Sequence, residues 1–133
     1  MRVFCLSPQE METCWQDFAV ILQRFERDCQ NLTADQVVTA VRNSTGHLWG
    51  LQDEHCVHGI VFTEIQQTAR GLVCVLVGAY GEGSEEDKRA VLAAIEDWAR
   101  DLHCISMRII GRKGWRRWDR RFRKTAEVLE CPL

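Results

Sequence analysis

The sequence predicts one α+β domain over residues 1–133, with helices first and a mixed sheet at its centre. Two N-terminal segments repeat apolar residues at three- and four-residue spacing, which is typical of amphipathic helices. Three segments rich in β-branched and aromatic residues follow with short links, which indicates an antiparallel meander. A helix then joins two apolar strands, and a helical crossover of this kind makes the two strands parallel.

Each N-terminal helix begins with a capping pattern. Ser7-Pro8-Gln9-Glu10 predicts the start of a helix that runs to about Asp28, after a short strand near Val3. Thr33 and Gln36 repeat the pattern for a shorter second helix. The meander strands are expected over residues 47–52, 57–65 and 71–78, with a tight connection at 53–54.

A glycine-rich stretch separates the third meander strand from the next helix. Ala79-Tyr80-Gly81-Glu82-Gly83, the glycine segment, is predicted to form a loop. Ser84 then caps a helix that runs to about residue 102, and a strand over residues 105–110 follows. A strand, a glycine loop and a helix N-terminus together can offer backbone N–H groups to a phosphate.

Basic side chains gather near the C-terminus. Residues 1–107 hold eight basic and sixteen acidic side chains, whereas residues 108–124, the basic patch, hold nine basic and one acidic. The patch points to an acidic partner surface, a phosphate or a nucleic acid. The side chains expected to make its contacts are Arg112, Lys113, Arg116, Arg117, Arg120 and Arg121.

Trp115, Trp118 and Phe122 form one face of a short helix predicted within the basic patch, and a closing strand is expected over residues 126–130. Aromatic residues at this spacing suit a face that packs on a core, and buried aromatic rings cannot stack on bases. A protein-contacting patch is therefore favoured over a nucleic-acid-binding one. Contact with the acidic remainder of another copy would also be possible.

The chain has seven cysteines, which show no CxxC pair, and no apolar run of the length that crosses a membrane. No segment resembles a secretion signal. We therefore expect reduced thiols, a cytosolic setting and no membrane contact.

The order of elements resembles the GNAT acetyltransferase superfamily over most of the chain. The superfamily's loop pattern is Gln/Arg-x-x-Gly-x-Gly/Ala, and Gly78-Ala79-Tyr80-Gly81-Glu82-Gly83 stands in its place. Gly81 and Gly83 match the pattern, whereas Gly78 replaces the Gln or Arg. The resemblance implies that acetyl-CoA would be held by Gly81, Gly83 and Ser84, and that Glu64 on a meander strand would act as the general base.

A narrower resemblance is to small GNAT-like proteins encoded by tailed bacteriophages. It implies a phage or prophage origin, a place in the bacterial host's cytoplasm or in the virion, and phage or virion proteins as partners. The residues that carry it are Leu48-Trp49-Gly50, Thr63-Glu64-Ile65, Ile95-Glu96-Asp97-Trp98-Ala99-Arg100 and Gly111-Arg112-Lys113-Gly114-Trp115.

Two features of the sequence argue against a working acetyl-CoA site. Acidic residues at 82 and 85–87 crowd the start of the helix. At about 6 Å and an effective dielectric near 20, each would repel a phosphate charge by roughly 2–3 kcal/mol before screening. GNAT enzymes often use a tyrosine of the last helix to protonate the departing thiolate, and residues 115–124 contain none, since Tyr80 is the only tyrosine.

His55-Cys56-Val57-His58, with His47 near, raises the possibility of a metal site. In a strand, Cys56 and His58 would share one face and His55 would point to the other, so three ligands are not expected to converge and no metal site is predicted. A nucleophile pair of Cys56 or Cys104 with His103 has no orienting partner at a suitable spacing.

Three functional interpretations remain. The favoured one is a phage-type GNAT-like protein with a degenerate acetyl-CoA site and no cofactor, which acts as a virion-associated or protein-interaction module. The first alternative is an active acetyl-CoA-dependent N-acetyltransferase. The second is a nucleic-acid-binding module that uses the basic patch.

Overall fold

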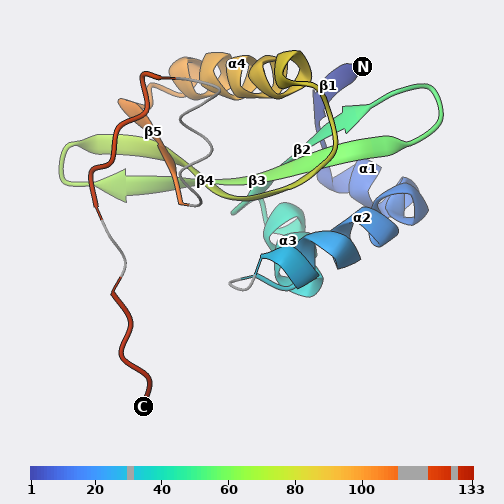
Figure 1. Ribbon diagram of the computed structural model, residues 1–133, viewed down its shortest axis with the longest axis horizontal. Coiled ribbons are helices and arrows are strands. Elements are labelled where there is room, and N and C mark those ends of the chain that lie inside the picture. Colours follow the sequence, from blue (N-terminus) through green and yellow to red (C-terminus); the bar gives the residue numbers. More distant parts are fainter. Residues whose placement is uncertain (30–31, 111–119, 127–128) are drawn as a thin grey trace.

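The computed structural model describes residues 1–29, 32–110, 120–126 and 129–133. A five-stranded sheet with helices on both faces forms its centre (Figure 1). The strands are β1 (Arg2–Cys5), β2 (His47–Gln52), β3 (Val57–Thr68), β4 (Gly71–Gly81) and β5 (Ser106–Ile109). The helices are α1 (Pro8–Thr13), α2 (Trp15–Asp28), α3 (Ala34–Arg42) and α4 (Glu85–Asp101).

The five strands lie side by side in the order of the chain. Each pair from β1 to β4 is antiparallel, whereas β4 and β5 are parallel and are joined through α4. The structure therefore confirms the predicted α+β fold, with its antiparallel meander and its one parallel crossover.

The sheet separates two hydrophobic cores. Helices α1, α2 and α3 cover one face, and α4 covers the other (Figure 1). Because side chains alternate along a strand, neighbouring residues of β3 enter different cores. Phe62 packs with the N-terminal helices, whereas Val61 packs with α4. Fully buried side chains from the helices include Phe18, Leu22 and Phe25 of α2 and Ile95 of α4.

Capping boxes begin three of the described helices. In α1 and α3 the caps are Ser7 with Glu10 and Thr33 with Gln36, as the sequence predicts. Ser84 begins α4 in the same way. None of the described helices combines the length and the apolar character needed to cross a membrane.

The helix predicted from Ser7 to about Asp28 is in fact two helices that meet at Cys14. The N–H of Cys14 bonds to Glu10, and its φ and ψ of −107° and 19° are not helical. The hydroxyl of Thr13 donates to the carbonyls of Gln9 and Glu10, at 3.2 and 3.3 Å. Bonds from a threonine hydroxyl to the preceding turn bend helices, and this one lies at the break.

Two predicted strand ends are too early. β3 continues to Thr68, and β4 continues through the first part of the glycine segment to Gly81, which pairs with Gly59. The predicted loop over 79–83 is therefore strand as far as Gly81. The predicted short helix is described only from residue 120, where the chain forms a turn at 120–121 and no helix at Phe122, and its part around Trp115 and Trp118 lies outside the described residues. The described part of the predicted closing strand, at 126 and 129–130, has no regular structure.

Candidate functional site

A bulge in β4 opens a gap between β4 and β5. The two strands pair up to Leu76, whose carbonyl accepts the Ile110 N–H at 3.2 Å. On the other side, Val77 is an extra residue in β4 that has no partner in β3. A bulge bends its strand. Beyond it, β4 runs on to Gly81 beside β3, and no described strand lies along its other edge.

A cleft of about 560 Å³ lies where β4 leaves β5. It follows the second half of β4 past the glycine segment to the first turns of α4. This volume falls within the range of roughly 300–1,000 Å³ that is usual for small-molecule sites. Among the described residues, those with ionisable side chains in the lining are Asp28, Cys29, Tyr80, Glu82 and Lys88.

Backbone groups of β4 point into this cleft. The N–H of Glu82 donates to the carbonyl of His58 in β3 at 3.0 Å. Alternate residues of an antiparallel strand direct their backbone groups to opposite edges, so those of Ala79 and Gly81 face away from β3. Both residues line the cleft. An edge of this kind can bind an extended ligand through main-chain hydrogen bonds.

The start of α4 uses several of its own hydrogen-bonding groups. The Ser84 N–H and hydroxyl donate to Asp87 Oδ2 at 3.1 and 2.9 Å, and the Asp87 N–H donates to Ser84 Oγ at 3.1 Å. Bonds from the Ser84 side chain and backbone hold the pKa of Asp87 below its usual value. A phosphate at this helix terminus would meet an ionised carboxylate and two amides that already have acceptors.

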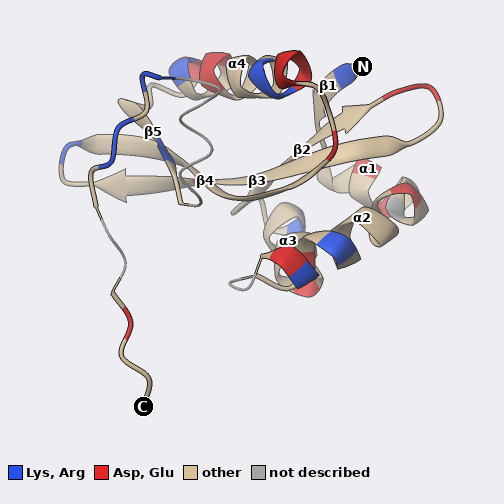
Figure 2. Ribbon diagram, in the orientation of Figure 1, with Lys and Arg blue, Asp and Glu red and all other residues tan. Residues whose placement is uncertain are grey.

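Acidic residues gather along the chain at the same terminus (Figure 2). Glu82, which lines the cleft, and Glu85 and Glu86 are exposed. Glu85 lies 3.7 Å from Arg89, one turn further along α4. Lys88 also lines the cleft and brings a positive charge to its α4 side.

Packing explains why glycine stands at position 78, where the GNAT pattern has Gln or Arg. A Cβ at Gly78 would lie 2.8 Å from the Phe25 ring and 3.1 Å from Cys29 Sγ. Helix α2 thus occupies the space that a larger side chain would need. Tyr80, two residues on, lines the cleft and packs against the core beneath α2.

The other residues proposed for acetyl-CoA chemistry are spread over the site. Gly81 and Gly83 line the cleft, whereas Ser84 lies at its border as the cap of α4. Glu64 lies in β3, where it pairs with Val75 of β4, and its side chain is half-buried. The cleft is lined by earlier residues of β3, and Glu64 is not among its described lining residues.

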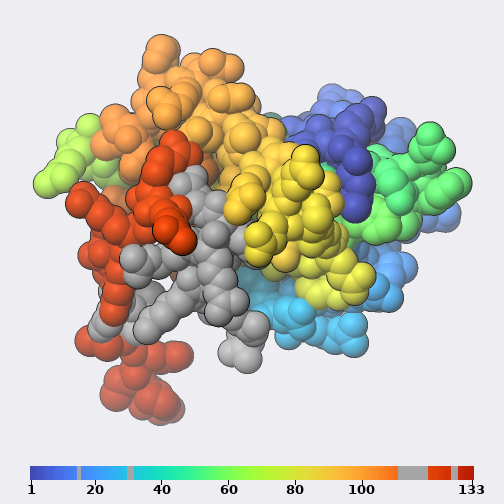
Figure 3. Space-filling view, turned by 45° about the horizontal axis from the view of Figure 1, so that its top comes forward, coloured from blue at the N-terminus to red at the C-terminus, as the bar shows by residue number. Residues whose placement is uncertain are grey.

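The described residues of the basic patch lie in two places: Arg108 is in β5, whereas the segment that begins at residue 120 passes beside α4 (Figures 2 and 3). Arg121 contacts Glu96 of α4 at 2.7 Å, and Arg100 lies 3.6 Å from the same carboxylate. Arg120 is exposed. Four of the predicted contact residues, Arg112, Lys113, Arg116 and Arg117, lie outside the described residues.

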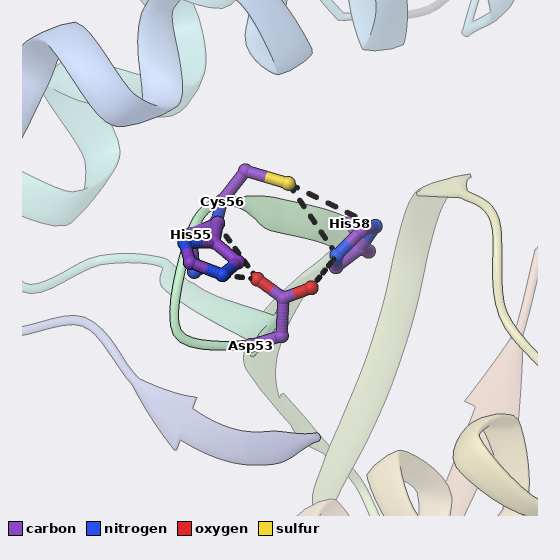
Figure 4. Close-up of polar contacts among 4 residues, drawn as sticks. All are labelled: Asp53, His55, Cys56 and His58. Carbon is purple, nitrogen blue, oxygen red and sulfur yellow. Dashed lines mark hydrogen bonds and ion pairs between the residues drawn. The ribbon is translucent and has the colours of Figure 1, made fainter.

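A second group of functional side chains gathers at the β2–β3 connection (Figure 4). Asp53 Oδ1 accepts the backbone N–H groups of His55 and Cys56 at 2.7 and 2.8 Å. Asp53 Oδ2 lies 2.5 Å from His58 Nε2, and Cys56 Sγ lies 3.4 Å from the same nitrogen. The Cys56 and His55 amides, with the His58 ring, hold the pKa of Asp53 well below its usual value.

Asp53 lies outside the His55-Cys56-Val57-His58 pattern from which a metal site was judged in the sequence. The structure brings Asp53 to Cys56 and His58, and we refer to these three residues as the Asp53 cluster. The available signal was the spacing Asp-x-x-Cys-x-His across a tight turn. The bulge that leaves His58 without a partner in β2 gives no comparable signal in the sequence.

No protein-family model matches the chain, and no curated protein matches its sequence. Solved structures, in contrast, match over nearly its whole length. A probable acetyltransferase superposes with a TM-score of 0.76 and 13% identity, over 100% of this chain and 97% of the other. A ribosomal-protein-alanine N-acetyltransferase from Brucella melitensis biovar Abortus 2308 gives 0.70 and 10%, over 100% and 99%.

A predicted acetyltransferase from Clostridium acetobutylicum, solved with acetyl-CoA, gives a TM-score of 0.70 at 13% identity, over 98% of this chain and 95% of the other. Identities this low leave the chemistry of each chain to be argued from its own site. They do agree on the architecture that the strand order and the crossover already indicate. The chain has the GNAT acetyltransferase fold.

Proposed function

We propose that the protein is an acetyl-CoA-dependent N-acetyltransferase whose acyl donor binds in the cleft beside β4. The observation that carries this proposal is the open edge of β4, which begins at the Val77 bulge and ends at the glycine segment. The structural relatives support it, since the Clostridium acetobutylicum structure contains acetyl-CoA. The sequence alone favoured a protein-interaction module with a degenerate acetyl-CoA site, and the active enzyme was its first alternative. We now place the enzyme first.

The cleft suits an extended ligand that carries amides at one end and phosphates at the other. Backbone groups of Ala79 and Gly81 would bond the amides of the pantetheine arm, as a neighbouring strand would. The N–H of Gly83 and the α4 terminus would face the pyrophosphate, with the positive charge of Lys88 nearby.

Acetyl-CoA supplies an activated acetyl thioester when bound. The acceptor amine forms the new C–N bond at the acetyl carbon, the C–S bond breaks, and the amine's proton must reach a base. The departing thiolate takes up a proton. Within the described lining, the side chains that can hold or move a proton are Asp28, Cys29, Tyr80, Glu82 and Lys88.

Glu64 remains our sequence-based proposal for the base. Because side chains alternate along β3, Glu64 shares the face of Ile60 and Phe62, so a role for it requires an acceptor amine that approaches from the α1–α3 side of the sheet. Glu64→Gln should lower kcat if Glu64 accepts the proton. Glu82→Gln and Tyr80→Phe, examined in parallel, test the side chains that do line the cleft.

Titration calorimetry with acetyl-CoA tests the proposal directly. We expect a dissociation constant below about 100 µM, equivalent to more than roughly 5 kcal/mol of binding free energy. Gly83→Glu places a carboxylate in the cleft and should abolish the binding heat. Ala93→Glu adds the same charge at an exposed position of α4 outside the cleft lining, and should leave binding unchanged.

Turnover should be followed by the mass of acetylated amines, because thiol reagents would also react with the exposed cysteines of the chain, Cys5, Cys56 and Cys131. Acetylation of a small panel of amines and N-terminal peptides, lost in Gly83→Glu, would support the enzyme. Failure of the wild-type chain to bind acetyl-CoA would reject it.

The hydrogen bonds at the start of α4 favour one alternative, a non-catalytic interaction module. Asp87 and Ser84 already occupy donors that a phosphate would use, and three exposed acids stand beside them. In that case acetyl-CoA would give no heat, and the partner would be a phage or virion protein or another copy of the chain. Co-purification with phage particles and light scattering of the pure chain distinguish these partners.

Nucleic-acid binding through the basic patch is the remaining proposal. Retention on DNA or heparin should then fall steeply with salt and should be lost when Arg116, Arg117 and Arg120 are replaced by Ala. Arg121 is a weaker candidate for such contacts, because it already pairs with Glu96.

A further inference from the structure

We propose that Asp53, Cys56 and His58 form a binding site for a divalent transition metal ion, with Zn²⁺ as the preferred ion. One carboxylate oxygen, one thiol sulfur and one imidazole nitrogen lie within 4.8 Å of one another. Asp53 and Cys56 belong to the β2–β3 connection and His58 to the start of β3, and none of the three lines the cleft (Figure 4). The site is therefore separate from the proposed acetyl-CoA site and does not depend on it.

The local backbone holds the three groups together. Asp53 Oδ1 accepts two backbone N–H groups of the turn, which leaves Oδ2 directed at His58. The register of β2 and β3 shifts between Leu51 and Gln52, which makes His58 an extra residue in β3. A bulge turns its side chain out of the regular alternation, and such bulges are common beside functional sites.

The backbone of His58 is fixed as well. Its carbonyl accepts the Glu82 N–H at 3.0 Å, which ties the hairpin to the glycine segment. His58 is thus held both by Asp53 of the turn and by the backbone of Glu82. Ligands that are already held in place lose less entropy when they bind a metal.

The distances need little change to accept a metal. With Zn–S near 2.3 Å and Zn–N or Zn–O near 2.1 Å, tetrahedral ligand atoms lie about 3.4–3.6 Å apart. Cys56 Sγ and His58 Nε2 are 3.4 Å apart. Asp53 Oδ2 and Nε2 are 2.5 Å apart, a hydrogen bond that must open by about 1 Å.

The arrangement fits a metal better than it fits a nucleophile. In a catalytic triad the acid and the nucleophile contact different nitrogens of the histidine. Here Asp53 and Cys56 both approach Nε2, whereas Nδ1 lies 4.0 Å from the thiol. The three donors therefore surround one point instead of forming a relay.

The ligand types select the ion. A thiolate with an imidazole favours zinc and related transition metals, whereas Mg²⁺ and Ca²⁺ prefer oxygen ligands only. Binding would release the Cys56 thiol proton, and the neutral His58 ring would bind through Nε2 with its proton on Nδ1. Three protein ligands leave one tetrahedral position for water or an external group.

Calorimetry of the full-length, tag-free chain with Zn²⁺ tests the site. We expect one ion per chain. Cys56→Ser and His58→Ala should each weaken binding by at least about 100-fold, since loss of an outer-shell partner alone can cost 10–100-fold. Cys131→Ser removes another exposed thiol and serves as the matched control, with no expected change.

Asp53→Asn is the third variant, because an amide oxygen can still accept the two backbone N–H groups and keep the turn folded. We expect it to weaken Zn²⁺ binding by roughly 10–100-fold. With Co²⁺ in place of zinc, a thiolate-to-metal charge-transfer band should appear in the wild type and in Cys131→Ser, and be absent in Cys56→Ser.

A thermal melt supplies a readout that is independent of coordination spectra. An ion that binds the folded chain raises its Tm, and this rise should disappear in Cys56→Ser. The proposal is overturned if the wild type binds no Zn²⁺, or if Cys56→Ser and Cys131→Ser bind it equally. Circular dichroism of each variant confirms that a loss of binding is not a loss of fold.

Discussion

Two aspartates organise two neighbouring parts of the chain, the β2–β3 connection and the start of α4, and they use their carboxylates differently. Asp53 binds the turn of the β2–β3 hairpin through Oδ1 and directs Oδ2 at His58. Asp87 uses Oδ2 for both the N–H and the hydroxyl of Ser84. The first arrangement leaves an oxygen beside a thiol and an imidazole, which suits a cation, whereas the second adds negative charge at a helix terminus that could otherwise hold an anion.

Strand β4 lies closest to β3 at Gly81, its last residue, and the largest effect is expected there. A Cβ at this residue would lie 2.3 Å from Gly59 Cα and 2.5 Å from the His58 carbonyl oxygen, and its φ is +146°. Gly81→Val should therefore destabilise the fold by about 3 kcal/mol or more. Urea unfolding measures the loss.

Gly83→Ala is the matched control for that substitution. Its Cβ would come no closer than 3.3 Å, to a methyl group of Leu51, so we expect a change of less than about 1 kcal/mol. Equal losses for the two variants would contradict the view that the close approach of β3 requires glycine at position 81.

The next effect concerns the cap that Asp87 shares with Ser84. Ser84→Ala removes the oxygen that accepts the Asp87 N–H, and should cost about 1 kcal/mol. Thr33→Ala removes the matching oxygen in α3 and should cost a similar amount. If Ser84→Ala left stability unchanged, the start of α4 would be stabilised by other contacts than the Ser84–Asp87 bonds. The proposed difference between Asp87 and Asp53 would then lose support.

The third effect depends on pH. Because the folded-state pKa of Asp87 lies below the ordinary value of 3.8, its contribution to stability is full above that pH and is lost as the pH falls through the folded pKa. The stability difference between the wild type and Asp87→Asn should therefore be constant above about pH 5 and shrink in more acidic solution.

Urea unfolding of both proteins over that pH range measures this dependence. Asp97→Asn, at an exposed position further along α4, is the control and should show a weaker dependence. If the stability difference between the wild type and Asp87→Asn grew on acidification, the lowered pKa of Asp87 in the folded state would be contradicted.

Residue patterns were sufficient for the layout and the caps. The boxes at Ser7, Thr33 and Ser84 are local, since each depends on residues three apart, and all three form as predicted. The extent of β2 also followed from its pattern. Such features need no knowledge of distant parts of the chain.

The features that make the cleft and the Asp53 cluster are not local. Val77 reads as an ordinary strand residue, and only the pairing with β3 shows that it is extra. The same holds for His58 against β2. Gly81 looked like a loop residue because glycine is common in loops, whereas here it allows a close approach of two strands.

The smallest effect tests how far charge at the α4 terminus opposes an anion. Glu86→Gln removes one exposed acid from the first turn while leaving Ser84 and Asp87 intact. The helix should lose about 0.3–1 kcal/mol of favourable dipole interaction, and acetyl-CoA should bind severalfold more tightly. The gain should be larger at low salt, because exposed charges are screened within about 10 Å at 0.1 M salt.

Calorimetry at two ionic strengths, with Asp97→Asn as the control, separates this local effect from a change in net charge, since both variants remove one negative charge. An equal gain in both would show that the acids of the first turn do not act on the cleft in particular.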